Sequence, residues 1–453
     1  MPTIKMTAQL LIVIAASLCL PHLGSAAEYF IAPTGDDANP GTIAQPFASI
    51  ARAQQAAQPG DTVYIRGGTY RISEEQIMRR RRIWTYVFDL HKSGRVDAPI
   101  RYWAWQDERP VFDFSQVRAE GTRIIAFFVT GSWLHFKGFE VVGVQVTMPG
   151  HTQSECFQNL GSHNIYEHLS MHDGQAIGFY LLDGSHNLVL NCDAYRNHDH
   201  TSENGLGGNT DGFGCHPRRG AVGNVFRGCR AWFNSDDGFD CIHASEAVTF
   251  EQCWAFYNGY TPDFRGLADG NGFKVGGWGR TPTNRLARPM PEHTVRFCLA
   301  VRNKANGFYA NHHPGGNVWI NNTAFRNRTN FNMLERVNHS NGIDFDMDAP
   351  GRSQKLYNNL GFRGRREVSN LDLHRSTTAG NYFDLGISVS EVDFQSLDET
   401  QLVLPRQADG SLPSITFLHL AAGSNCIDKG IDVGFPFHGA APDLGCFEFD
   451  PGP

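Results

Sequence analysis

One six-residue motif recurs through the middle of the chain. Its gapless copies share a central alanine and a closing asparagine. They are Cys192–Asn197, Cys229–Asn234, Cys253–Asn258, Cys298–Asn303 and Asn322–Asn327, and Asn359–Gly364 is a weaker copy. Successive copies start 37, 24, 45, 24 and 37 residues apart, so 24 is one period and the longer spacings imply insertions or skipped turns. A period of this size is typical of a solenoid, whose repeats bury their apolar faces against one another.

Short segments of alternating polarity precede the copies, for example Asn187–Leu190, Asn224–Arg227 and Asn317–Ile320. Alternation with a period of two predicts strands rather than helices. Three short strands in a coil of about 22–24 residues predict an all-β fold, a right-handed parallel β-helix. Equivalent residues of successive coils then stack about 4.8 Å apart. The closing asparagines should therefore form a hydrogen-bonded column and the leading cysteines an inward one.

The first residues indicate a signal for export. Leu10–Leu20 is apolar but too short to cross a bilayer, and the small residues Gly24–Ala27 offer a cleavage site. We therefore expect residues 1–27 to be a secretory signal peptide and the protein to be secreted, either from the cell or into a periplasm.

The remaining residues are expected to form a single β-helix domain. Ile50–Ala57 has a short helical pattern that ends at Pro59, which suggests an N-terminal capping helix over the first coil. The expected parts are 28–453 for the domain, with 28–75 as N-terminal cap and first coil, 130–374 as main coils and 375–453 as a C-terminal wrap.

Composition narrows the classes of ligand. The formal net charge is −7, which excludes a generally basic nucleic-acid binder. An acidic ligand would need a local basic patch or a bridging cation. Nine cysteines follow the signal peptide, an odd number and a low density, so most of them are expected to be core residues rather than disulfide partners.

The Gly-Phe pairs at 212–213, 238–239 and 272–273 align the polar residues of three successive coils. This superposition puts Asp211, Asp237 and Asn271 in one column and Asp240 and Lys274 in another, with Asp236 just outside. Four carboxylates within about 10 Å repel one another unless something neutralises them. A hard cation with oxygen ligands is the natural partner, and Ca²⁺ suits several carboxylates better than Zn²⁺.

The order and spacing of these residues resemble the site of polysaccharide lyase family 9, the pectate lyases. The resemblance implies a right-handed β-helix and a calcium ion held by Asp211, Asp236, Asp237 and Asp240. It also implies that Lys274 is the base that removes the C5 proton of polygalacturonate, so that the chain is cleaved by β-elimination. A neutral lysine base favours an alkaline activity optimum.

The expected partner is an acidic polysaccharide, with no nucleic acid or membrane, and the protein is expected to be a monomer. Arginine and lysine side chains should hold the carboxylates of neighbouring sugars, and a tyrosine in the Lys274 column could line the groove. The candidates for substrate binding are Asn271, Arg280, Arg302, Lys304 and Tyr309.

Two alternatives remain open at this stage. Asn209–Gly212 and Asp236–Asp237 also resemble the acid and base of polygalacturonases of glycoside hydrolase family 28, whose later Gly-His-Gly and Arg-Ile-Lys motifs are absent here. The other alternative is a non-catalytic glycan-binding solenoid, against which the clustered aspartates and lysine argue.

Overall fold

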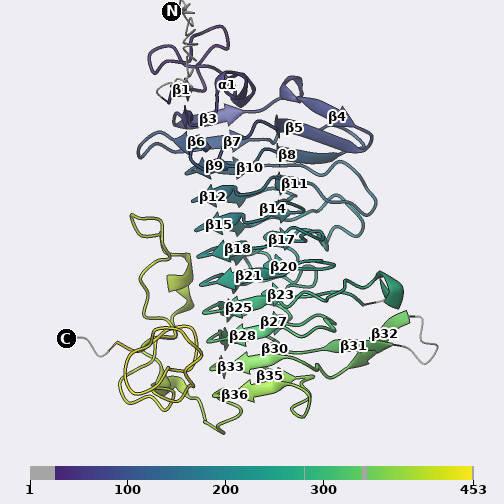
Figure 1. Ribbon diagram of the computed structural model, residues 1–453, viewed down its shortest axis with the longest axis vertical. Helices are drawn as coiled ribbons and strands as arrows, with labels where there is room; N and C mark the ends of the chain where they lie inside the picture. Colours follow the sequence, from purple (N-terminus) through teal and green to yellow (C-terminus); the bar gives the residue numbers. More distant parts are fainter. Residues whose placement is uncertain (1–25, 280, 339–343, 451–453) are drawn as a thin grey trace, which may run out of the picture.

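Three long sheets wind into one elongated coil (Figure 1). The computed structural model describes residues 26–279, 281–338 and 344–450. Most of the predicted signal peptide and the candidate Arg280 lie outside the described residues. Each coil contributes one strand to each sheet in turn, so strands that neighbour one another in a sheet come from successive coils. The prediction of a parallel β-helix is confirmed.

The strands are short, as the period of the repeat requires. The first sheet contains, in spatial order, β1 (Glu28–Ile31), β2 (Thr62–Ile65), β6 (Ile100–Ala104), β9 (Leu134–Lys137), β12 (Ile165–Glu167), β15 (Leu188–Leu190), β18 (Asn224–Arg227), β21 (Val248–Glu251), β25 (Thr294–Arg296), β28 (Val318–Ile320), β33 (Lys355–Tyr357) and β36 (Thr377–Ala379). The second sheet contains β3 (Gly68–Arg71), β7 (Pro110–Asp113), β10 (Glu140–Val142), β13 (Ser170–His172), β16 (Asp193–Tyr195), β19 (Arg230–Trp232), β22 (Trp254–Phe256), β26 (Leu299–Val301), β29 (Thr323–Phe325) and β34 (Leu360–Phe362).

The third sheet carries the candidate site. It contains β4 (Arg79–Arg81), β5 (Trp84–Leu90), β8 (Arg123–Val129), β11 (Glu155–Asn159), β14 (Ile177–Leu181), β17 (Phe213–Cys215), β20 (Phe239–Asp240), β23 (Phe273–Lys274), β27 (Asn306–Tyr309), β30 (Thr329–Asn332) and β35 (Arg366–Ser369). Its neighbours pair in parallel except β4 and β5, which form an antiparallel hairpin at one edge. A small separate sheet contains β24 (Thr281–Pro282), β31 (Glu335–Asn338) and β32 (Asp344–Ala349).

The core contains ladders of identical residues. In the third sheet, the rings of Phe213, Phe239 and Phe273 are buried and stack with centroids 4.8 Å apart at each step. The predicted asparagine column is confirmed by amide-to-amide hydrogen bonds such as Asn258 Nδ2 to Asn303 Oδ1, 3.0 Å. Because these amides are buried, each step satisfies polar groups that would otherwise be desolvated without a partner.

Helical elements lie mainly towards the two ends of the sequence. Helix α1 (Ile50–Ala56) follows the N-cap Ser49, whose side chain accepts the N–H of Arg52, and it packs against β1 and β5. Its predicted role as a cap over the first coil stays a prediction. The 3₁₀ segments are η1 (Glu74–Gln76), η2 (Thr283–Arg285), η3 (Glu391–Asp393) and η4 (Glu399–Val403).

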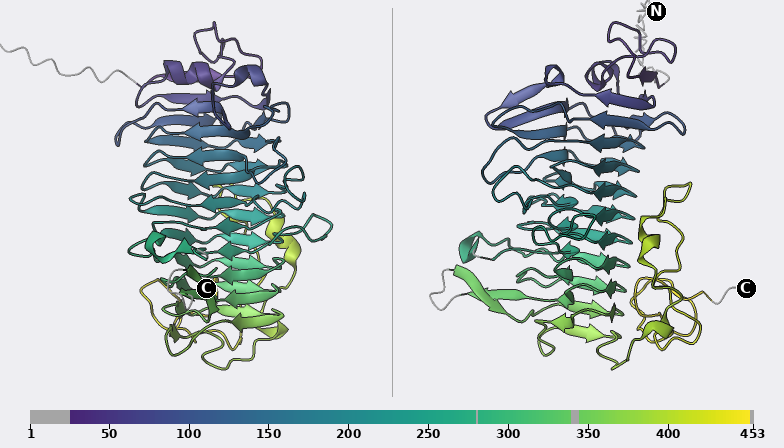
Figure 2. Two further views of the ribbon diagram at one scale, coloured as in Figure 1. Left: turned by 90° about the vertical axis from the view of Figure 1, so that its right-hand side faces the viewer. Right: turned by 180° about the vertical axis from the view of Figure 1, so that it is seen from behind.

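The C-terminal segment runs back along the outside of the coils, as the yellow-green trace in Figure 2 shows. Buried Arg230 in β19 donates to the carbonyl of Leu402, and Arg406 forms an ion pair with Asp193 at 2.6 Å. In the part of the chain that the structure describes, no helix is long and apolar enough to cross a membrane. The nine cysteines from Cys156 to Cys446 are free thiols, and all but Cys446 are buried, as expected for core residues.

Candidate active site

Two columns of polar side chains cross the third sheet at β17, β20 and β23. The pairing of β20 with β23 puts Asp240 beside Lys274, and the pairing of β23 with β27 puts Lys274 beside Tyr309. In the other column, the N–H of Asp237 donates to Asp211 Oδ1 at 3.2 Å. The two columns predicted from the Gly-Phe pairs are therefore present.

Lys274 is the centre of an ion-pair cluster. Its Nζ lies 2.9 Å from Asp237 Oδ2 and 3.1 Å from Asp240 Oδ2. One carboxylate oxygen each of Asp211, Asp237 and Asp240 lies within 4.8 Å of the others, and all three residues are buried. The lysine side chain is 12% exposed, so it is largely shielded from solvent.

Asn271 orients one of these carboxylates. Both its backbone N–H and its Nδ2 donate to Asp237 Oδ1 at 2.7 Å, while its own Oδ1 accepts Nδ2 of Asn306 at 2.7 Å. This leaves Asp237 Oδ2 with no hydrogen bond and with the Lys274 ion pair. Asn271 thus fixes which oxygen of Asp237 faces the cluster.

Asp236 lies beside the three carboxylates without belonging to their group. It is buried, and its Oδ1 accepts the N–H of Asp269 at 3.1 Å, which ties it to the insertion between β22 and β23. The structure therefore brings Asp211, Asp237, Asp240 and Lys274 into contact, with Asp236 at the edge.

Burial and mutual repulsion shape the protonation of the cluster. Burial raises the pKa of Asp211 well above its usual range, and the charges of Asp240 and Asp236 raise it further. Burial also raises the pKa of Asp237, against the opposing charge of Lys274. For Lys274, burial alone lowers the pKa, but the neighbouring carboxylates outweigh it and raise the pKa well above 10.5.

The donor set fits a hard divalent cation. The cluster offers only carboxylate oxygens, and one of them, Asp237 Oδ2, is buried without a hydrogen bond. Oxygen-only sites with several carboxylates are typical of Ca²⁺, whereas zinc sites favour nitrogen and sulfur ligands. Asp211, Asp237 and Asp240 are the residues that would hold such an ion.

The other sequence candidates differ in what they contact. Tyr309 is the neighbour of Lys274, and burial raises its pKa to about 12. Lys304 donates from Nζ to the carbonyls of Leu267 and Ala268, so it fastens the insertion after β22. Arg302 stacks on Phe264, 3.9 Å from the ring centroid, and its Nη1 lies 3.5 Å from a carboxylate oxygen of Glu399 in the C-terminal wrap.

Tyr180 and His216 were not predicted as site residues. Tyr180 pairs with Gly214, which pairs with Asp240, so it stands in the Lys274 column two steps before Asp240. Its ring centroid lies 4.8 Å from that of His216, whose Nδ1 hydrogen-bonds the carbonyl of Ile242 at 2.7 Å. The sequence held a signal for Tyr180, because it follows a Gly-Phe pair at the same offset as Asp240.

Comparison with known proteins decides the family. Residues 29–342 match the family described as Pel9A-like, right handed beta helix region. The chain belongs to this family. Pectate lyase L of Dickeya dadantii is 35% identical over 425 residues, which cover 93% of this chain and 90% of that protein. The resemblance to polysaccharide lyase family 9 is confirmed, as are the right-handed β-helix and the enzyme class, a polysaccharide lyase.

Two solved structures extend the comparison. One described as a rhamnogalacturonan lyase has a TM-score of 0.83 and 43% identity, covering 87% of this chain and 96% of that chain. The crystal structure of pectate lyase Pel9A has a TM-score of 0.73 and 32% identity, covering 94% of this chain and 97% of that chain. The chain is thus similar along most of its length to lyases with two different names.

Proposed function

We propose that the protein is a secreted, calcium-dependent lyase that cleaves a 1,4-linked uronate glycan, pectate in the first instance, by β-elimination. The observation that carries this proposal is the position of Lys274 Nζ beside two buried carboxylates of an oxygen-only cluster. The similarity to pectate lyase L over 93% of the chain supports pectate as the substrate. Secretion rests on residues 1–27 of the sequence, and a monomer is the proposed state.

Lys274 is the proposed base. Its neutral Nζ takes the proton from C5 of the uronate, the electron pair of that C–H bond forms the C4–C5 double bond, and the C4–O bond breaks. The leaving oxygen takes a proton from water, and the products are a reducing end and a 4,5-unsaturated sugar. When bound, Ca²⁺ supplies positive charge that offsets the aspartates and the uronate carboxylate, and so favours both the neutral lysine and loss of the C5 proton.

The other residues have positioning roles in this proposal. Asp211, Asp237, Asp240 and, at the edge, Asp236 hold the cation. Asn271 turns Asp237 Oδ2 towards Lys274 by holding the other oxygen. Tyr309 continues the Lys274 column and lines the surface over which the glycan lies.

Ultraviolet absorbance of polygalacturonate tests the proposal directly, because only elimination creates the conjugated unsaturated product. With Ca²⁺, the unmodified protein is expected to produce this absorbance. Chelation of the Ca²⁺ is expected to stop the increase in absorbance. Lys274→Ala is expected to lower kcat by about 10²–10⁴-fold while calcium binding, measured by calorimetry, persists. Lys355→Ala, at a half-exposed lysine of β33 paired with Glu292, is the matched control. Reducing ends without absorbance would indicate hydrolysis and overturn the proposal.

Rhamnogalacturonan is the second candidate substrate, favoured by the 43% identity to the structure with that name. It shares the uronate on which Lys274 would act but places rhamnose between successive uronates. The same absorbance assay on both polymers separates the candidates. A higher kcat/KM on rhamnogalacturonan would reassign the substrate and leave the roles of the lysine and the cation in place.

A further inference from the structure

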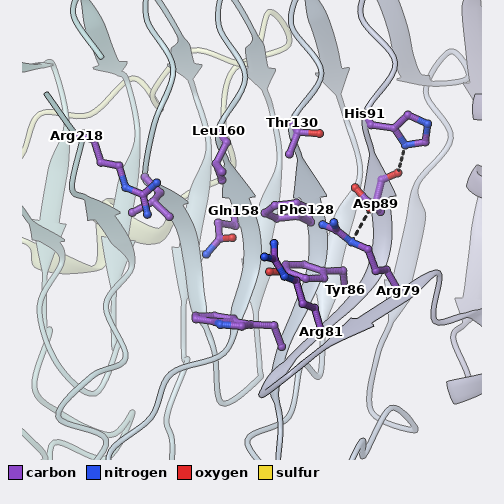
Figure 3. A pocket seen from close by; sticks show the side chains of 12 residues that line it. Arg79, Arg81, Tyr86, Asp89, His91, Phe128, Thr130, Gln158, Leu160 and Arg218 are labelled. Carbon is purple, nitrogen blue, oxygen red and sulfur yellow. Dashed lines mark hydrogen bonds and ion pairs between the residues drawn. The ribbon is translucent and has the colours of Figure 1, made fainter. Parts of the chain in front are cut away.

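A hollow lies on the outer face of the third sheet, near its N-terminal edge (Figure 3). It has a volume of about 570 Å³ and is built mainly from β5, β8, β11 and the β4–β5 hairpin. Its wall is aromatic, with Tyr86 and Phe128 4.2 Å apart at their ring centroids. Its cations are Arg79, Arg81 and Arg218, and we call it the arginine hollow.

The arginine hollow stands in line with the proposed active site. Phe128 pairs with Gln158, which pairs with Tyr180, and Tyr180 belongs to the column that continues to Asp240 and Lys274. Five steps between neighbouring strands separate β8 from β23. At about 4.8 Å per step the two places lie about 24 Å apart on one face of the sheet.

The three arginines differ in how they are held. Arg79 Nε lies 2.8 Å from Asp89 Oδ2, and the guanidinium stacks over Tyr86 at 4.4 Å and Phe128 at 5.1 Å from the ring centroids. The side chain of Arg81 is exposed and has no ion-pair partner among the described residues.

Arg218, at the opposite side of the hollow in Figure 3, is exposed, and its Nη1 is 3.8 Å from Asp183 Oδ2. Packing of the hairpin accounts for Arg79, because that guanidinium fills the space against the two rings. It does not account for Arg81 or Arg218, whose cations face solvent.

The charge of the hollow opposes that of the protein. Three arginines line it against one aspartate, Asp89, which Arg79 already neutralises, whereas the whole chain has a formal net charge of −7. A concave surface with one sign of charge concentrates ligands of the opposite sign. Arginine forks suit a sugar ring that carries a carboxylate, because a guanidinium binds the carboxylate in bidentate fashion, and the half-buried indole of Trp84 in the same lining offers an apolar surface to the ring.

We propose that the arginine hollow is a second binding site for the acidic glycan, about 24 Å along the same face from Lys274, so that one long chain contacts both places. This inference rests on the proposed function for the identity of the ligand. It predicts that the hollow raises the affinity for long chains, because a chain bound at Lys274 meets the hollow at a high effective concentration. Chains too short to extend from Lys274 to the hollow should gain no affinity from it.

The test compares long galacturonate oligomers with galacturonate trimers. Arg81→Gln combined with Arg218→Gln is expected to weaken binding of the long oligomer about 10-fold, and to raise KM for it with kcat unchanged, since two exposed charge-assisted contacts are lost. The trimer should show no change. Arg81→Lys with Arg218→Lys keeps the charge and should restore part of the affinity. Arg227→Gln, an exposed arginine of β18 in the first sheet, is the matched control.

Binding is measured by calorimetry in the Lys274→Ala background, where the ligand is not consumed, and turnover is measured with Lys274 intact. If the Arg81→Gln and Arg218→Gln double variant loses affinity equally for the trimer and the long oligomer, or loses affinity for neither, the proposed second site is overturned. If the unmodified protein cleaves the long oligomer and the double variant behaves identically, only this inference fails. If the unmodified protein neither binds nor cleaves galacturonate, both the inference and the pectate assignment fail.

Discussion

Replacing Gly238 by alanine is expected to disturb the proposed active site without touching any charged group. Gly238 belongs to the Gly-Phe pair between Asp237 and Phe239, and it faces the next coil. A Cβ atom at this position would lie 2.7 Å from the carbonyl oxygen of Gly272 and 2.9 Å from Nδ2 of Asn258. Neither group is free to move, because the first is backbone and the second is part of the asparagine ladder.

The size of the disturbance follows from these distances. Ordinary Cβ contacts begin at 3.4 Å, so the β20 backbone must shift by about 0.7 Å relative to β23. Crowding of this kind in a packed interior costs about 1–3 kcal/mol of folding free energy. The same shift moves Asp237 and Asp240 relative to Lys274, and a displacement approaching 1 Å in a catalytic arrangement costs up to about 10²-fold in rate. We therefore expect kcat to fall about 10- to 100-fold and calcium affinity to fall with it.

The matched control is Gly150→Ala, because a Cβ there meets nothing within 4 Å. Both variants are assayed by absorbance on polygalacturonate, by calcium titration and by thermal unfolding. A Gly238→Ala protein with the stability, calcium affinity and kcat of the control would refute the reasoning that the glycine column sets the geometry of the carboxylates. A loss of stability with unchanged calcium affinity would show that the coil absorbs the shift elsewhere.

Three further outcomes are expected. Asn303→Ala should destabilise the protein by about 2–5 kcal/mol, measured by denaturant unfolding, because it leaves buried polar groups of neighbouring ladder residues, such as Asn258 N–H, without partners. Glu167, held by His135 at 2.8 Å and Lys137 at 2.9 Å, has a pKa lowered from 4.5 to about 2. The stabilisation by this carboxylate is present above pH 4.5 and is lost as the pH falls towards 2. Glu167→Gln should therefore lower the free energy of unfolding by about 1 kcal/mol at neutral pH, after discounting for solvent screening. The unfolding free energies of the variant and the unmodified protein, measured against pH, should converge near pH 2. Chelation should lower the unfolding free energy by about 2.7 kcal/mol relative to protein with free Ca²⁺ at 100 times its Kd, and an unchanged melting curve would argue against the cation site.

The sequence was sufficient for the coil and for the register of the cluster. Once the Gly-Phe pairs are superimposed, parallel pairing leaves no freedom in which residue of one coil lies beside which residue of the next. Asp240 and Lys274 are 34 positions apart in sequence, yet their contact follows from their equal offsets after Gly238 and Gly272. Repetition therefore converts a sequence alignment within the chain into a spatial prediction.

The same logic does not reach side chains on turns and insertions. Arg302 and Lys304 follow β26 at a bend where Arg302 has a φ of 47°, and their directions depend on what the insertion and the C-terminal wrap place next to them. The arginine hollow was also beyond prediction, because the β4–β5 hairpin that contributes Arg79 and Arg81 pairs antiparallel and stands outside the repeat. Asp236 could be placed near the cluster, but the hydrogen bond that draws its Oδ1 towards Asp269 comes from an insertion.

The cluster can be understood as a modification of a structural ladder. Along one column, the N–H groups of Asp237 and Asn271 donate to Oδ1 of the residue one coil before. Asparagine and aspartate perform this task equally well, since either offers one oxygen as acceptor. The difference lies in the second polar atom, which is an NH₂ group in Asn271 and a charged oxygen in Asp211 and Asp237. A change from amide to carboxylate thus keeps the hydrogen bond that holds the coils together and adds a negative charge facing Lys274. In Asp237 the ladder hydrogen bonds and the proposed chemistry use different oxygens of one side chain, so Asp237→Asn is expected to retain the ladder while it removes the proposed ligand oxygen and its ion pair with Lys274.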